Sequence, residues 1–167
     1  MAKAFASQGD MAEKNVSFTE IGDGLYAFTA EGDPNSGVII GDNSVMIVEA
    51  QATPRLANKV IECVRSVTDK PITHLVMTHY HAVRVLGASA FNAPQVIMSE
   101  KARSMVVERG QEDWDSEFAR FPRLFQGHEE IPGLTWPTTT FNGRMSVYLG
   151  NRRVDIMQLG RAHTAGD

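Results

Sequence analysis

The sequence predicts an α/β fold, in which helices pack on a partly parallel β-sheet. Short aliphatic runs, typical of buried strands, alternate with segments whose apolar side chains recur at helical spacing. From residue 72 onward the expected order is strand, helix, strand, helix, which is the order of a parallel αβ layer. The 167 residues are enough for one domain with a buried core.

Composition narrows the class of protein. The apolar fraction of 43% and the charged fraction of 22% are ordinary for a globular protein in water. The net charge of −4, without a Lys or Arg cluster, argues against a nucleic-acid or membrane partner. No apolar stretch approaches the roughly 20 residues of a membrane span. We therefore expect a cytoplasmic protein that acts on a small molecule, with a flexible tail at residues 1–15 and one domain at residues 16–167.

The first half of the domain should consist of strands followed by a helix. Residues 25–28 follow a Gly-Asp-Gly turn and favour a strand. Residues 38–40 and 45–48 are apolar runs joined by a short Gly/Asp/Asn linker, which predicts a β-hairpin in a sheet covered on both faces. Thr53 and Pro54 suit the N-cap and first position of a helix that continues to about residue 67.

Two histidines follow the next expected strand, residues 72–77. Side chains two apart in an extended segment point the same way, so His79 and His81 leave this strand aimed at one spot. Small and aliphatic residues at 82–90 then predict a helix. A pair of loop histidines is equally compatible with hydrogen bonds to backbone or water, so the pair alone leaves a metal site open.

The remaining elements follow from similar patterns. Residues 95–98 favour a strand, and Ser99 can cap a helix to about residue 109 with Gly110 as its stop. Residues 111–137 are less regular, and their aromatic side chains either pack on the core or line a pocket. Alternating residues from 145 to 156 predict a hairpin that leads to His163, which is set among small, turn-forming residues.

Three histidines at strand ends are enough for one zinc ion, because zinc accepts three protein ligands plus water. The chain resembles the metallo-β-lactamase-fold hydrolases, whose motif His-x-His-x-Asp-His is followed much later by a His in a Gly-His-Thr-x-Gly-like turn. His79, His81 and His163 match the first metal site of that family. Val83 stands in place of the Asp and Arg84 in place of the last His. The resemblance thus implies one metal, zinc or alternatively iron, rather than the usual two.

The resemblance also implies an architecture and a partner. Family members pack two αβ halves sheet on sheet, and this chain matches the first half plus the third histidine. The expected fold is therefore the first αβ half of an αββα metallo-β-lactamase-like sandwich, incomplete at the C-terminus. Such a sheet would expose an apolar face. We expect either a homo-oligomer, in which a second copy covers this face, or a missing C-terminal half.

Glu49 is the candidate catalytic residue. It follows the strand at residues 45–48, where the family usually has an Asp near the metals. The resemblance implies that Glu49 bonds a ligand imidazole from behind or partly replaces the missing carboxylate; the alternative is a solvated Glu at a strand end. Arg84 either holds a substrate carboxylate or pairs with a nearby acid.

The function implied by the resemblance is metal-dependent hydrolysis. A metal on three neutral imidazoles lowers the pKa of a bound water towards about 7, and the resulting hydroxide can attack an ester, thioester, lactone or amide carbonyl. One alternative is a non-catalytic metal-binding or association module that has lost the second metal site. Another is oxygen chemistry at iron, which wants two His and a carboxylate, and only Glu49 could supply the latter.

Overall fold

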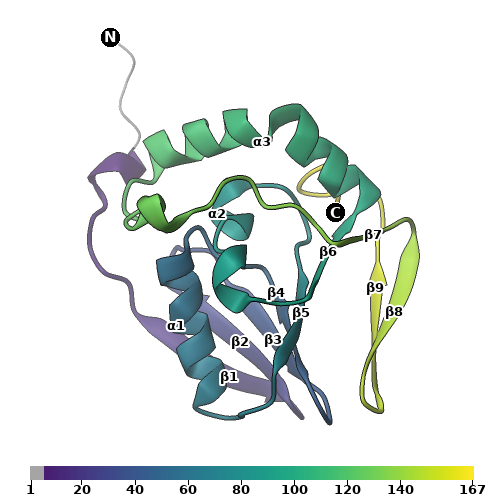
Figure 1. Ribbon diagram of the computed structural model, residues 1–167. Coiled ribbons are helices and arrows are strands. Elements are labelled where there is room, and N and C mark those ends of the chain that lie inside the picture. Colours follow the sequence, from purple (N-terminus) through teal and green to yellow (C-terminus); the bar gives the residue numbers. More distant parts are fainter. Residues whose placement is uncertain (1–5) are drawn as a thin grey trace.

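The computed structural model describes residues 6–167. A mixed sheet of seven strands runs in the order β1-β2-β3-β4-β5-β6-β7 (Figure 1). Neighbouring strands from β1 to β4 are antiparallel, whereas β4 to β7 are parallel. The α/β class with a partly parallel sheet is confirmed. The strands are β1 Val16–Gly22, β2 Leu25–Ala30, β3 Ser36–Ile40, β4 Val45–Val48, β5 Ile72–Val76, β6 Gln95–Ser99 and β7 Thr139–Phe141.

The first half of the chain folds as its pattern predicts. β3 and β4 form the expected antiparallel hairpin. α1 (Pro54–Arg65) begins at the expected residue, because the Thr53 hydroxyl accepts a hydrogen bond from the Leu56 N–H and proline tolerates the first turn. The chain then returns through β5, which pairs with β4 in parallel. This β-α-β unit aims the end of β5 at the same edge of the sheet as the end of β4.

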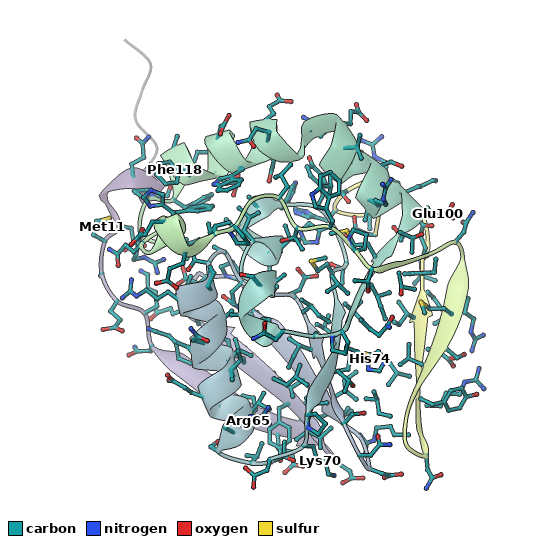
Figure 2. All side chains as sticks on the ribbon, viewed as in Figure 1. Met11, Arg65, Lys70, His74, Glu100 and Phe118 are labelled. Atoms are coloured by element: carbon teal, nitrogen blue, oxygen red, sulfur yellow. The ribbon has the colours of Figure 1, made fainter. Side chains whose placement is uncertain are left out.

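Two apolar cores cover the two faces of the sheet, as predicted. On one face, α1 and the short helices α2 (Ala82–Val85) and η2 (Ala88–Phe91) enclose the larger core. On the other face lies the hairpin of β8 (Arg144–Leu149) and β9 (Arg152–Met157), which Figure 1 shows on the side away from α1. Figure 2 shows the side chains that fill both layers. The smaller core under this hairpin contains Met46, Val76, Ile97, Val147 and Leu149.

Two helices differ from the prediction. The helix expected at residues 82–90 is split at Gly87, whose N–H donates to the Gln51 carbonyl oxygen at 3.0 Å instead of continuing a helix. α3 (Glu100–Arg120) runs through the expected stop at Gly110. That glycine is buried, and a Cβ added to it would lie 3.4 Å from the side chain of Leu134. Tertiary packing thus overrides the weak local preference of glycine for helix ends.

α3 spans the end of the sheet at which the parallel strands finish. Figure 1 shows it above the ends of β5 and β6, with residue 167 beneath it. In Figure 2, Glu100 marks the start of α3, and Lys70 marks the opposite end of the molecule, where β5 begins. The loops that leave β4 and β5 therefore meet the segment after β9 under this helix.

The N-terminal residues that the structure describes contact the domain. Residues 1–5 of the expected tail lie outside the described residues. Ala6–Gly9 form a short 3-10 helix, η1, and the Ser7 hydroxyl donates to the Arg120 carbonyl oxygen at 2.7 Å. Within residues 6–167, no helix combines the length and apolar character needed to cross a membrane.

Candidate metal centre

Three imidazoles converge at the end of the sheet beneath α3. His79 and His81 lie in the loop between β5 and α2, and His163 lies in the segment after β9. One nitrogen from each ring falls within 4.8 Å of the others. The His81 Nδ1 and His163 Nε2 atoms are 3.2 Å apart, and the ring planes are nearly perpendicular to one another, at 85°, 86° and 89°. The structure thus brings together the three residues that the sequence nominates as ligands.

His163 is carried by a loop that packs on the start of α3. The Ser99 hydroxyl donates to the Gly166 carbonyl oxygen at 2.5 Å, and the Gly166 N–H donates to the Thr164 hydroxyl at 3.1 Å. A Cβ added at Gly166 would stand 2.6 Å from the Cα of Ala102, so only glycine permits this approach. The small residues around His163 therefore let the third imidazole reach the other two.

A chain of hydrogen bonds from Glu49 orients His79. The Thr78 hydroxyl donates to Glu49 Oε1 at 2.5 Å and lies 2.8 Å from His79 Nδ1. The hydroxyl has one hydrogen and gives it to Glu49, so it accepts its second bond from an N–H at the Nδ1 position of His79. We assign His79 to this tautomer. It leaves Nε2 as the nitrogen with a free lone pair, which is the form that binds a metal.

Burial keeps two of the imidazoles neutral. It lowers the pKa of His79 to about 4, with a further contribution from His81. Burial also lowers the pKa of His81, although Asp113 opposes that shift. Two nitrogens at about 2.0–2.1 Å from a tetrahedral zinc lie about 3.3 Å apart, which is close to the 3.2 Å between His81 and His163. The spacing of the His81–His163 pair and the neutrality of His79 and His81 fit a zinc ion, and the nitrogen of His79 lies within 4.8 Å of that pair.

Glu49 is buried rather than solvated, so its interpretation as an ordinary strand-end Glu is wrong. Only 7% of the residue is exposed, and burial raises the pKa of its carboxyl group. Oε1 accepts hydrogen bonds from both the N–H and the hydroxyl of Thr78 and lies 4.0 Å from His79 Nδ1. Oε2 is buried and has no hydrogen-bond partner among the described residues. The carboxylate therefore lies directly behind the first histidine of the cluster.

The loop after β4 is strained in a way that places Glu49. Glu49 and Gln51 have φ angles of 69° and 67°, and such left-handed conformations cost roughly 1–3 kcal/mol each outside glycine. The Ser36 hydroxyl donates to the Glu49 carbonyl oxygen at 2.8 Å, and the Gln51 amide donates to the Ser36 hydroxyl at 2.7 Å and to the Pro34 carbonyl oxygen at 3.0 Å. These bonds enforce the turn that aims Glu49 at Thr78.

Two carboxylates near the cluster are absent from the sequence-based prediction. Asp113 on α3 accepts a hydrogen bond from the Ala82 N–H at 2.7 Å, and its Oδ1 lies 3.9 Å from His81 Nε2. Asp167 Oδ1 lies 4.0 Å from His79 Nδ1. Asp167 adjoins the His163 turn, which is the signal that could have drawn attention to it. No local signal marks Asp113, since the helix that carries it was expected to end at Gly110.

The two departures from the family motif have different surroundings. Val83 packs against the larger core and offers no metal ligand. Arg84 Nη1 donates to the Asn35 carbonyl oxygen at 3.3 Å. Burial raises the pKa of the Glu49 carboxyl group, and the charge of Arg84 opposes that shift. The pairing of Arg84 with a nearby acid and the binding of a substrate anion therefore both stay predictions.

The remaining histidines lie elsewhere. His74 lies within β5 (Figure 2), and its Nδ1 is 2.8 Å from the Thr73 hydroxyl. His128 begins η3 (His128–Glu130), and its exposed ring packs edge-on against Phe118 with centroids 5.0 Å apart. Neither belongs to the group of three.

Comparison with known proteins gives structural matches at low identity. No protein-family model matches the sequence. A metallo-β-lactamase from Pontibacter korlensis matches with a TM-score of 0.68 at 14% identity, over 92% of this chain and 65% of that one. FEZ-1 metallo-β-lactamase from Legionella gormanii matches with a TM-score of 0.70 at 14% identity, over 93% and 57%. A double mutant of the sec-alkyl sulfatase PisA1 matches with a TM-score of 0.67 at 16% identity, over 91% and 28%. The chain thus spans less than two thirds of each of these proteins.

Proposed function

We propose that this chain, which has the metallo-β-lactamase fold, is a metal-dependent hydrolase that uses zinc to cleave an ester, thioester, lactone or amide of a small molecule. The observation that carries the proposal is the convergence of three histidine nitrogens within 4.8 Å at the end of the sheet. The fold and this group of histidines both fit a metal-dependent hydrolase family. A bound metal of this kind polarises the carbonyl oxygen of such compounds.

The residues of the chain divide into ligands, a positioning pair and an anion-binding residue. His79, His81 and His163 would hold the metal. The chemistry that a divalent metal supplies when bound is Lewis acidity, which polarises a carbonyl and acidifies a water molecule. Glu49 acts on His79 through Thr78, so its role is to orient a ligand rather than to touch the substrate. Arg84, whose guanidinium donates to the Asn35 carbonyl oxygen at 3.3 Å, suits an anionic group of the substrate.

Metal content and turnover test the proposal together. Chain loaded with zinc and then dialysed should retain about one equivalent by elemental analysis, as expected for three ligands plus water. A panel of esters, thioesters, lactones and amides should include at least one compound whose hydrolysis stops with a chelator and returns with zinc. Zinc without turnover would favour the non-catalytic metal-binding module, to which Val83 at the position of the motif Asp points. Absence of zinc binding would contradict both functions, and bound iron with oxygen uptake would favour the oxygenase.

The link between Glu49 and His79 gives a second prediction. Thr78→Val should weaken zinc binding by about 10-fold or more, because valine fills a similar space but cannot join the carboxylate to the imidazole. Thr78→Ser keeps the hydroxyl and should bind zinc as the unmodified chain does. Chelator competition measures the affinities, and the imidazole nitrogen chemical shifts of His79 report its tautomer. Equal affinities for the two variants would show that this chain of hydrogen bonds does not orient His79.

A further inference from the structure

We propose that Asp113 is a positioning residue for the metal centre: its carboxylate, carried by α3, orients His81 through Nε2, the ring nitrogen other than the one beside His163. This inference rests on the proposed function, because it concerns how a ligand of that centre is oriented. It assigns to a residue of a distant helix the orientation of one ligand.

The two nitrogens of His81 face different neighbours. Nδ1 lies 3.2 Å from His163 Nε2 and therefore belongs to the cluster of ligand atoms. Nε2 lies 3.9 Å from Asp113 Oδ1. A metal-bound histidine typically donates its other N–H to a carboxylate, carbonyl or water, which fixes its tautomer and ring orientation. Asp113 stands where such a partner of His81 is required.

A hydrogen bond from the backbone fixes the position of the Asp113 carboxylate. Its Oδ2 accepts a hydrogen bond of 2.7 Å from the N–H of Ala82, the first residue of α2. This bond links the carboxylate to the backbone directly after His81 and so keeps the acid close to the imidazole. The 3.9 Å between Oδ1 and Nε2 is longer than a hydrogen bond, so in this structure the carboxylate acts on the imidazole through its charge.

Among the described residues, His81 is the basic partner of Asp113. Its side chain is only 14% exposed, and within residues 6–167 His81 is the basic group found at ion-pair distance. The neighbouring Glu117 carries a like charge, and burial together with Asp113 raises the pKa of the Glu117 carboxyl group. A largely buried carboxylate beside another acid gains from a nearby N–H group, and Nε2 of His81 is the ring nitrogen that lies toward Asp113, at 3.9 Å.

The unexpected length of α3 explains how the acid reaches the site. Gly110 lies one turn before Asp113, and its lack of a side chain lets Leu134 pack on the helix without ending it. The helix can therefore continue over α2 and present Asp113 to the His81 loop. Val83, which packs against the larger core, does not supply a carboxylate next to His81, whereas Asp113 on this helix does.

Two substitutions separate positioning from simple helix capping. Asp113→Asn keeps an oxygen that can accept from the Ala82 N–H but removes the charge offered to His81, whereas Asp113→Ala removes both. We expect zinc affinity, measured by chelator competition, to fall about 10- to 100-fold in both variants. The visible absorption spectrum of the cobalt-loaded protein should also change, because the orientation of a ligand changes. Asp115→Asn is the matched control: Asp115 lies on the same helix, where it accepts from Gln111 at 2.9 Å in an exposed position.

The possible outcomes distinguish the positioning role of Asp113 from the proposed hydrolase function. Weakened zinc binding in Asp113→Asn, with metal-free stability like that of Asp115→Asn, supports the positioning role. Unchanged zinc affinity and cobalt spectrum in Asp113→Asn, alongside destabilisation of Asp113→Ala alone, reduce Asp113 to a cap of α2 and overturn the inference while the proposed function stands. Failure of the unmodified chain to bind zinc or cobalt overturns the proposed function and this inference with it.

Discussion

Alanine in place of His79, His81 or His163 is expected to lower zinc affinity by more than about 100-fold and to abolish zinc-dependent hydrolysis. The expectation follows from ligand count, because a site with three protein ligands is left with two. Loss of a hydrogen-bond partner behind a ligand already costs about 10- to 100-fold in affinity, and loss of the ligand itself must cost more. The effect should be similar at all three positions, although His163 lies far from the other two in the sequence.

His128→Ala is the matched control for these variants. Its ring is exposed and lies outside the group of three, so zinc affinity and turnover should equal those of the unmodified chain. Chelator competition gives the affinities, and circular dichroism checks the fold, which matters most for His79 because it is 7% exposed. Retention of the zinc affinity in His163→Ala would show that the late histidine does not share a cation with the early pair.

Features set by neighbouring residues were predictable from the sequence. The strands β3 to β6 contain aliphatic runs, the Thr53-Pro54 pair marks the start of α1, and alternation marks the β8–β9 hairpin. The convergence of His79 and His81 follows from the alternation of side chains at the end of a strand. His163 was predicted by motif resemblance, and its geometry depends on the close packing of Gly166 against Ala102.

Features set by contacts between distant residues could not be predicted. The hydrogen bond from Gly87 to the loop after β4 splits the expected helix, and the packing of Leu134 on Gly110 lets α3 continue. The burial of Glu49 depends on bonds between Gln51, Ser36 and the strained loop itself. Each requires knowledge of which segments lie side by side, and local propensity carries no such information. Asp113 was missed for this reason.

Gly87→Ala is expected to destabilise the folded chain by about 3 kcal/mol, the upper part of the usual range for overpacking. The backbone angle of Gly87 is not the cause, since its φ of −77° suits any residue. Space is the cause. A Cβ added there would stand 2.2 Å from the Ala50 carbonyl oxygen and 2.7 Å from that of Thr53. Both oxygens belong to buried backbone and cannot turn aside as a flexible side chain would.

The same substitution should reach the metal centre. Gly87 donates to the Gln51 carbonyl oxygen at 3.0 Å, and the Ala50 N–H donates to the Arg84 carbonyl oxygen at 2.7 Å. These two bonds clamp the loop that carries Glu49 onto the helix that follows His81, and the added methyl group would force the two segments apart. Urea unfolding of Gly87→Ala should therefore show a lower midpoint together with weaker zinc binding. Gly9→Ala, where an added Cβ meets no atom within 4 Å, should change neither quantity. A Gly87→Ala variant as stable as Gly9→Ala would mean that the two segments separate freely, and the loop would then be too loosely held to orient His79 through Glu49.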